Sequence, residues 1–466
     1  MNLDYLSVTQ QAKMLADGEV SSRELTQHCL DRITRYNADM KAFVNVLVDD
    51  AMAQADALDE TLAKTGRPVG PLHGVPMCIK DEDAVKGVRQ GYGTNAVSTP
   101  APDDCEAVRR LREAGAVFVG ITAMPEFGQW PFTESTTHGY TRNPWNRERS
   151  VHGSSGGTAA AVSSGMVAAG MGGDGGGSIR LPAAWCNLFG LKVQRGRVSS
   201  APAAALWRGL GVVGPLTHTV ADSALINDVI ASHLPIDKYE AGPWPEPLSA
   251  ALTRDPGPLR ILLAEKPAAG GSQLEAQQRD ALYRVGKMLE DAGHHVDTGD
   301  LPKYKPGLAM IGEMAGGVTD ELKLIEHPKR LELRTRHAAP LFRLLAPLSD
   351  SSERKADKVA AQVFTVFDRY DLLLTPTTPT PPLPLGVING HGLLHTIMVS
   401  LKYTAYTAIW NVLGNPAAAI PAGFTTDGLP LSVQLVGAPN SEPLIVQVAR
   451  QIEDALPWAD KHPQLG

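Results

Sequence analysis

The stretch that decides the fold covers residues 153–180 and reads GSSGGTAAAVSSGMVAAGMGGDGGGSIR. Between positions 153 and 177, ten of 25 residues are glycine, against an average near 7%. Glycine costs stability inside regular elements, so this density indicates tight turns, close packing, or backbone amides turned toward a ligand. Two glycine turns carry serines, namely Ser154 and Ser155 in the first and Ser178 in the second. The small residues at 158–167 between them predict a tightly packed helix.

The second turn has the composition of an anion-binding nest. Three glycines follow Asp174 and precede Ser178, so successive backbone N–H groups can point into one cavity and hold a developing oxyanion. Phosphate binding is the weaker interpretation, because no G-x-x-x-x-G-K-[ST] motif occurs and no clear strand precedes the glycines. The pattern therefore favours acyl transfer on a serine.

A serine hydroxyl needs a base, and no histidine stands in a triad pattern with Ser178. Lys80 ends the apolar stretch GVPMCIKD at residues 74–81. Burial disfavours an ammonium, so a buried Lys80 can supply a neutral amine as the base. The alternative is that Lys80 pairs with Asp81 or Asp83 at the surface.

Composition excludes several classes of protein. The chain has 466 residues, with 43 Lys and Arg against 50 Asp and Glu, hence a formal charge of −7. This balance disfavours nucleic-acid binding, and 43% apolar residues exclude general disorder. The four cysteines form no CxxC pair, which excludes a zinc ribbon. We find no signal peptide or membrane span and expect a reduced, cytoplasmic protein.

Strand and helix patterns alternate along the chain, which favours an α/β layered sheet. Ser21 and Glu24 form a capping box that starts an N-terminal helix. Further helices are expected at 47–65, 104–114, 272–292, 319–362 (exposed) and 441–456. Strands are expected at 77–79, 117–121, 259–265, 295–298, 370–375 and 431–437. The Pro- and Thr-rich run at 375–384 should be extended and irregular.

Taken together, the motifs resemble the amidase signature family over most of the chain. The matching pieces are GVPMCIKD (74–81), AMPEFG (123–128), TRNPWN (141–146), GSSGGT (153–158), GDGGGSIRLPAAWCNLFGLK (173–192) and GNPAAAIPAGFTTDGLPLSVQLVG (414–437). Within the family, the chain is similar to bacterial amidases of the group that acts on nylon oligomers and aryl acylamides. The resemblance implies an α/β fold with a mixed central β-sheet sandwiched between α-helical layers.

The resemblance also assigns roles to residues. It implies a Ser–cisSer–Lys triad with Ser178 as nucleophile, Ser154, preceded by a cis peptide bond, as proton relay, and Lys80 as general base. The implied mechanism needs no metal and no organic cofactor. The implied oxyanion hole is formed by the backbone amides of Gly175, Gly176, Gly177 and Ser178. Residues implied to hold the loop from behind are Ser155, Asp174 and Arg180. Candidates for the substrate pocket are Met124, Phe127, Trp130 and Trp207, each of which also fits a core position.

Two departures from the family pattern stand out. Gly173 and Gly175 replace a threonine and a larger residue, which predicts a more flexible oxyanion loop or more room beside the nucleophile. The stretch 120–123 lacks the lysine and asparagine often found before the M-P-E-F-like motif, which favours less polar substrates.

The expected activity is hydrolysis of a carboxylic amide C–N bond through an acyl-enzyme on Ser178. Aryl amides, carbamates (urethanes) and esters share the required carbonyl and leaving group. One alternative is the amidase-like glutaminase subunit of a tRNA-dependent amidotransferase. Another is an α/β-hydrolase esterase that uses Ser155 of G-x-S-x-G, with His391 or His395 as base.

We expect one domain over 1–466. It comprises an N-terminal helical part (about 1–65), a signature core (about 70–200), a variable substrate-side region (about 200–370) and a C-terminal sheet and helix (about 370–466). The expected partner is a small-molecule amide or carbamate, and we expect no nucleic acid and no membrane as partners. A homodimer is the oligomeric state proposed for the chain.

Overall fold

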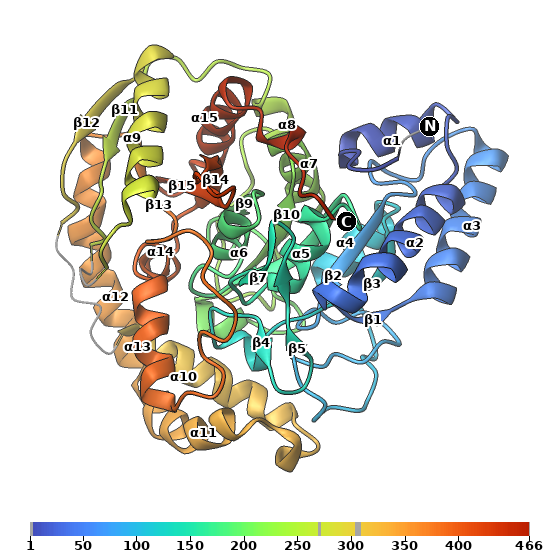
Figure 1. Ribbon diagram of the computed structural model, residues 1–466, viewed down its shortest axis with the longest axis horizontal. Helices are drawn as coiled ribbons and strands as arrows, with labels where there is room; N and C mark the ends of the chain where they lie inside the picture. The colour runs from blue at the N-terminus through green and yellow to red at the C-terminus, as the bar shows by residue number, and fades with distance from the viewer. Residues whose placement is uncertain (1–2, 269–271, 303–308, 466) are drawn as a thin grey trace.

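A computed structural model describes residues 3–268, 272–302 and 309–465. One mixed sheet crosses the molecule in the strand order β1-β3-β2-β8-β10-β9-β14-β15-β13-β11-β12 (Figure 1). Strands β2, β3 and β8 pair in parallel, as do β11, β12 and β13, and the strands between these two groups are antiparallel. This is the mixed α/β sheet that the sequence predicts.

The strands of the main sheet are β1 (Phe43–Val46), β2 (Pro76–Lys80), β3 (Val117–Thr122), β8 (Ala169–Asp174), β9 (Phe189–Lys192), β10 (Val212–Thr217), β11 (Arg260–Leu263), β12 (His295–Thr298), β13 (Leu372–Pro376), β14 (Ala417–Phe424) and β15 (Pro430–Gly437). Two small hairpins add β4 (Glu134–Ser135), β5 (Gly139–Tyr140), β6 (Arg142–Asn143) and β7 (Asn146–Ser150).

The helices are α1 (Val8–Ala16), α2 (Ser22–Met40), α3 (Val48–Thr65), α4 (Glu106–Glu113), α5 (Gly156–Ser163), α6 (Arg180–Trp185), α7 (Val220–Ile230), α8 (Leu248–Ala251), α9 (Ala276–Asp291), α10 (Ala309–Glu321), α11 (Leu333–Leu345), α12 (Ser349–Val363), α13 (Leu393–Tyr403), α14 (Ala408–Leu413) and α15 (Glu442–Ala455). The capping box at Ser21 and Glu24 starts α2, as predicted.

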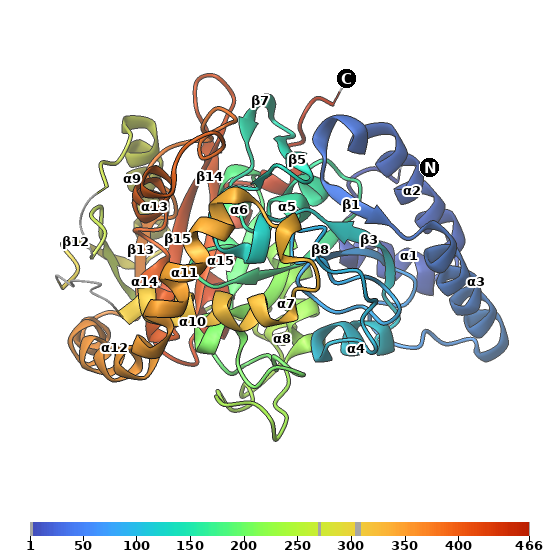
Figure 2. The ribbon, with the colours of Figure 1, turned by 90° about the horizontal axis from the view of Figure 1, so that it is seen from below.

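Alternating side chains of the buried strands supply a separate core on each face of the sheet. In β13, Leu372 and Leu374 pack into one core with α7, α9 and α15, whereas Leu373 faces a second core with α12 and α14. Helices α5 and α6 cover the middle of the sheet on this second face, against β8 and β14. Figures 1 and 2 show the sheet between these helical layers.

Helices α10, α11 and α13 form a cap outside the second layer (Figure 2). The sequence predicts exposed helices at 319–362, and α11 and α12 fall there. The expectation of exposure is wrong for part of α11, because Thr335, Ala338 and Phe342 are buried. Their core includes Trp130 and Trp185, which lie far away in the sequence.

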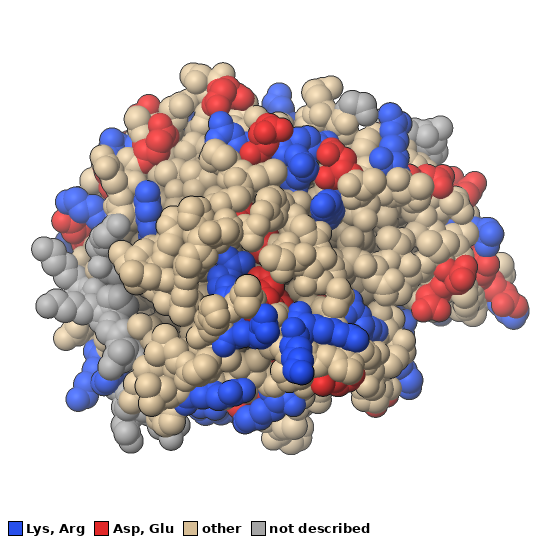
Figure 3. All heavy atoms as spheres, turned by 60° about the horizontal axis from the view of Figure 1, so that its bottom comes forward, with Lys and Arg blue, Asp and Glu red and all other residues tan. Residues whose placement is uncertain are grey.

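The surface mixes both charge signs. On the face in Figure 3, Lys and Arg side chains gather over the lower middle, and Asp and Glu are scattered around the upper and right-hand edges. In the described ranges, no helix combines the length and apolar character needed to cross a bilayer.

The sheet order explains why distant motifs meet. Strands β2 and β8 are parallel neighbours, with Met77 opposite Ala169 and Cys78 opposite Gly170. Their carboxyl ends therefore lie at the same edge of the sheet. Lys80 ends β2 and Asp174 ends β8, so the predicted base and the predicted oxyanion loop start from adjacent positions.

Candidate active site

Lys80 and Ser154 form the central contact of the site. The Lys80 side chain is fully buried, and its Nζ donates a hydrogen bond of 2.8 Å to Ser154 Oγ. The peptide bond between Gly153 and Ser154 is cis, as the resemblance implies. Lys80, Ser154 and Ser178 line one small cavity, called here the lysine–serine cavity. The structure thus brings together the three residues predicted as the triad.

Glu82 is a member of the site that sequence reasoning missed. Its Oε1 lies 2.8 Å from Lys80 Nζ, and both side chains are buried. The alternative, a surface pairing of Lys80 with Asp81 or Asp83, does not occur, because Lys80 is buried. The chain turns directly after β2, with the Asp83 amide donating to the Lys80 carbonyl at 2.9 Å, and this turn brings Glu82 to the lysine. No spacing in the sequence identifies Glu82, since its contact with Lys80 depends on how the chain turns after β2.

Asp81, in the turn after β2, has a different function. Its carboxylate accepts the amides of Gly91 and Gly93 at 2.9 and 2.8 Å. Burial raises the pKa of Asp81 to about 6, although these hydrogen bonds oppose the shift. Asp81 therefore organises the loop that follows β2.

Ser178 lies in the turn between β8 and α6 and is 9% exposed. Within the described ranges its hydroxyl makes no hydrogen bond to Ser154 or to any other side chain, so it is available to a substrate. The amides of Gly175, Gly176 and Ser178 likewise have no acceptor in the part of the chain that the structure describes. The amide of Gly177 instead donates to Asp174 Oδ1 at 2.7 Å. Because that amide has an internal partner, we leave Gly177 out of the candidate oxyanion hole.

A buried ion pair holds this turn from behind. Arg180 Nε and Nη2 donate to the two carboxylate oxygens of Asp174 at 3.0 and 2.9 Å, and neither side chain is exposed. Burial alone favours the neutral acid, but Arg180 overcomes it and lowers the pKa of Asp174 well below the ordinary value. Asn411 donates to Asp174 as well, at 2.9 Å. The turn is therefore anchored to the C-terminal part of the chain.

Ser155 is a structural neighbour of the turn. Its hydroxyl donates to the carbonyl of Gly173 at 3.2 Å, and its amide donates to the carbonyl of Ser178, also at 3.2 Å. These contacts tie the first glycine turn to the second. Neither the side chain of Ser155 nor that of Arg180 lines the lysine–serine cavity.

The α/β-hydrolase alternative lacks its required setting. The strand before Ser155 is β7, which belongs to a two-stranded hairpin outside the main sheet. His391 and His395 stack on each other with ring centroids 4.1 Å apart, and His395 Nε2 contacts the carbonyl of Val387. No described contact links either histidine to Ser155.

Of the four predicted pocket residues, Trp207 lines the lysine–serine cavity and a larger cavity next to it. Phe127 and Trp130 lie in the core under α10 and α11, and Met124 is 1% exposed. These three residues line neither of the two cavities, because the loop after β3 turns inward. Its aromatic rings pack against the cap helices and Trp185.

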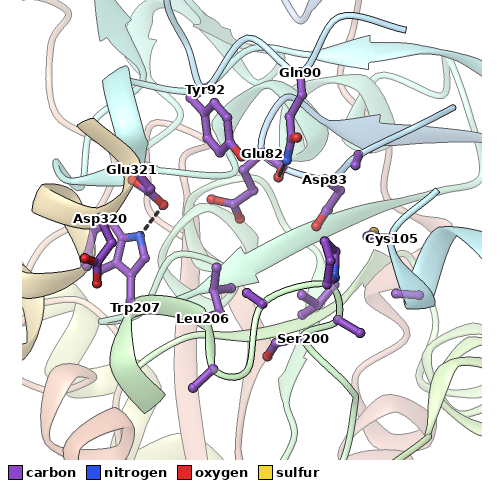
Figure 4. Close-up of a pocket in the computed structure, with 18 of the residues that line it drawn as sticks. Glu82, Asp83, Gln90, Tyr92, Cys105, Ser200, Leu206, Trp207, Asp320 and Glu321 are labelled. Atoms are coloured by element: carbon purple, nitrogen blue, oxygen red, sulfur yellow. Dashed lines mark hydrogen bonds between the residues drawn. The ribbon is translucent and has the colours of Figure 1, made fainter. Parts of the chain in front are cut away.

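A larger cavity adjoins the lysine–serine cavity, and we call it the side cavity. Its walls include Glu82, Asp83, Tyr92, Trp207, Asp320 and Glu321 (Figure 4). Its volume is about 390 Å³, whereas the lysine–serine cavity has about 10 Å³, which is room for about one water molecule. Both cavities share Glu82, Leu206 and Trp207 as lining residues. The side cavity therefore offers room for a substrate beside Trp207 and close to Ser178.

The mixed sheet and the paired glycine–serine turns over a buried lysine define the class of amidohydrolases, which act on carbon–nitrogen bonds. The amidase family model matches residues 24–446. The chain belongs to the amidase signature family. It is 39% identical over 469 residues to the amidase-family protein AmiB2 of Mycobacterium tuberculosis (strain ATCC 25618 / H37Rv), covering 100% of this chain and 99% of that protein.

Other relatives carry more specific names. Identity to the A subunit of glutamyl-tRNA(Gln) amidotransferase from Prochlorococcus marinus (strain MIT 9313) is 33% over 489 residues, covering 98% of this chain and 99% of that protein. Among solved structures, a 6-aminohexanoate cyclic dimer hydrolase complexed with substrate has a TM-score of 0.91 at 28% identity, covering 99% of each chain. A bacterial aryl acylamidase has a TM-score of 0.87 at 26% identity, covering 98% of this chain and 97% of the other.

Proposed function

We propose that this amidohydrolase cleaves carboxylic amides through an acyl-enzyme on Ser178, with Ser154 as proton relay and Lys80 as general base. The observation that carries the proposal is the 2.8 Å hydrogen bond between Lys80 Nζ and Ser154 Oγ inside a buried cavity that Ser178 also lines. In its neutral form, Lys80 accepts a proton from Ser154, which accepts one from Ser178. Glu82 carries the counter-charge of the protonated amine.

The chemistry then proceeds in two halves. Ser178 Oγ forms a bond to the carbonyl carbon, and the amides of Gly175, Gly176 and Ser178 bind the resulting oxyanion. The C–N bond breaks as the relay returns the proton to the departing amine. Water attacks the acyl-enzyme by the same route, which releases the acid and restores Ser178. Aryl amides, carbamates and esters offer the same carbonyl and a suitable leaving group, and we propose them as substrates.

The test is labelling with a fluorophosphonate probe, followed by intact mass measurement and peptide mapping. We expect one adduct on Ser178, and none in Ser178→Ala. Hydrolysis of a 4-nitroanilide by the same preparation should disappear in parallel with labelling. An adduct on Ser155 and unchanged hydrolysis in Ser178→Ala would contradict the proposal.

A second candidate function rests on the relative at 33% identity, which is one component of an amidotransferase. As the glutaminase component of such a complex, the chain would use the same serines to release ammonia from glutamine. Assays for glutaminase activity and for co-purifying proteins distinguish this function from free amide hydrolysis. Light scattering on the purified protein tests whether it forms the proposed homodimer.

A further inference from the structure

The side cavity carries more carboxylates than the cations around it balance. Asp320 pairs with Arg208 at 2.9 Å and with Lys323 at 2.7 Å, and Glu82 pairs with Lys80. Asp83 and Glu321 have no counter-charge within ion-pair distance in the described ranges. The carboxyl groups of the side cavity that lack an ion-pair partner in the described part of the chain are therefore these two.

Both uncompensated carboxylates are buried and incompletely hydrogen-bonded. Asp83 is 7% exposed and Glu321 is 9% exposed. Glu321 Oε1 accepts the indole N–H of Trp207 at 2.8 Å. Asp83 Oδ2 and Glu321 Oε2 have no hydrogen-bond partner among the residues the structure describes. Figure 4 shows both carboxyl groups at the wall of the side cavity. A buried carboxyl oxygen without a partner is costly, and a ligand donor removes that cost.

The remaining walls suit an organic cation. The rings of Tyr92 and Trp207 line the cavity together with Leu206. Aromatic faces attract an ammonium and also pack against the methylenes that carry it. No group of three or more metal-ligating side chains that could hold a metal ion occurs in the described ranges. The cavity volume of about 390 Å³ falls within the usual size of a small-molecule pocket.

We propose that the side cavity binds a protonated amino group of the substrate, attracted by the carboxyl groups of Asp83 and Glu321 at different sides of the cavity, with its alkyl or aryl stem beside Tyr92 and Trp207 (Figure 4). This assignment rests on the proposed function, because it places the ammonium on an amide or carbamate whose carbonyl lies at Ser178. The substrate class is therefore amides or carbamates with a free amino group remote from the scissile bond. Contacts to that remote group supply binding energy that orients the carbonyl.

The protonation states fit this occupant. Burial, and then the neighbouring Glu82, raise the pKa of Asp83 to about 8 despite the opposing charge of Lys80. Burial and Glu82 also raise the pKa of Glu321. At neutral pH Asp83 is therefore largely protonated, and an ammonium bound in the cavity favours ionisation of both Asp83 and Glu321. The remaining titratable groups at the cavity are Tyr92, Cys105, Asp320 and Arg208.

The first experiment compares hexylammonium with hexan-1-ol by isothermal titration calorimetry at pH 8.5. At this pH Asp83 is mostly ionised, whereas an alkylamine with a pKa near that of lysine, about 10.4, stays protonated. We expect hexylammonium to bind at least about tenfold more tightly, a difference of about 1.4 kcal/mol. Between pH 8.5 and 6.5 its affinity should fall and that of hexan-1-ol should not. Equal affinities, or no pH dependence for hexylammonium, overturn the proposal.

The second experiment uses variants. Asp83→Asn combined with Glu321→Gln should remove most of the preference for hexylammonium. The matched control, Asp103→Asn with Glu290→Gln, removes the same charges from exposed positions and should keep it. If the double variant misfolds, the proposal is still tested by the first experiment, because that comparison of hexylammonium with hexan-1-ol uses the wild-type protein. Retained preference in a folded double variant overturns it.

The third experiment asks whether the enzyme also prefers substrates that carry an ammonium group. Two pairs of amides are compared, and each pair consists of an amide with an ammonium group and a neutral amide of the same size. In one pair the ammonium is in the acyl half of the amide, and in the other pair it is in the amine half. We expect kcat/KM to favour the ammonium by about tenfold in one pair, and equal values in both pairs overturn the substrate assignment. Binding of hexylammonium without hydrolysis of any amide would instead contradict the proposed function alone.

Discussion

The carboxylate of Glu82 occupies the space that a side chain at Gly173 would fill. A Cβ at position 173 would approach Glu82 Oε1 far closer than the 3.0 Å that real Cβ contacts respect. The same oxygen lies 2.8 Å from Lys80 Nζ. The glycine expected to leave room beside the nucleophile thus admits the acid that contacts the predicted base. Likewise, a Cβ at Gly175 would lie 3.2 Å from the ring of Trp207.

Gly173→Ala should therefore act through Glu82. The added methyl group displaces the carboxylate from Lys80, and we expect kcat/KM for a 4-nitroanilide to fall by about tenfold or more. Glu82→Gln alone should lower activity for the same reason. Steady-state kinetics should show that the double variant is no worse than the more damaged single variant.

The control for this prediction is Gly392→Ala. A Cβ at Gly392 meets nothing within 4 Å, and its φ of −73° suits any residue. Full activity in Gly173→Ala, or additive losses in the double variant, would show that Glu82 and Gly173 act independently.

Lys80→Ala should lose most activity at neutral pH and remain folded. Without the amine, Ser154 loses the proposed base to which it is hydrogen-bonded, and we expect kcat/KM to fall by about 10²-fold or more. Hydrolysis of a 4-nitroanilide and circular dichroism are measured together. Lys287→Ala, which removes an exposed lysine, serves as the control. Full activity in a folded Lys80→Ala variant would contradict the proposed proton relay from Ser178 through Ser154 to Lys80.

Asp174→Asn should destabilise the protein in a pH-dependent manner. Breaking a buried ion pair costs roughly 3–5 kcal/mol. The lowered pKa of Asp174 means that its stabilising effect is complete above the unfolded value of about 3.9 and is lost as pH falls through the folded value. The difference in Tm between wild type and Asp174→Asn should thus be constant above about pH 5 and shrink toward pH 3.

The measurement is a series of thermal melts between pH 3 and 7, with Asp103→Asn as the surface control. A difference in Tm that stays the same at all pH values would contradict the assignment of an ionised Asp174. Activity should fall as well, since Asp174 also accepts the Gly177 amide.

Much of the fold is predictable from the sequence because many strands carry apolar, β-branched runs. The segments 117–121, 295–298 and 431–437 coincide with β3, β12 and β15 to within a residue. Strand β8 has the sequence AGMGGD, and glycine has low β-propensity, so no local pattern indicates a strand. Tertiary contacts explain it: Cβ atoms at Gly170 and Gly172 would collide with Cys78 and Ser155.

The candidate site likewise has a part that the sequence predicts and a part that only the fold reveals. Lys80, Ser154 and Ser178 stand in motifs that the sequence displays, and the structure brings them to one cavity. Glu321 is 114 positions from Trp207, its hydrogen-bond partner. No local spacing predicts that contact, because it depends on how α10 packs over the turn at Trp207. The side cavity therefore becomes visible only in three dimensions.

Trp207 separates the two cavities, and its replacement should show which substrates use both. Its ring lines each cavity, and its N–H holds Glu321 at 2.8 Å. Trp207→Ala removes apolar contact surface and lets water reach the lysine–serine cavity, so KM for an anilide should rise by about tenfold. Trp207→Phe keeps a ring but loses the hydrogen bond, so KM should change by less than about threefold. Steady-state kinetics of both variants on one anilide tests this. If Trp207→Ala leaves KM unchanged, the substrate does not extend past Trp207 into the side cavity.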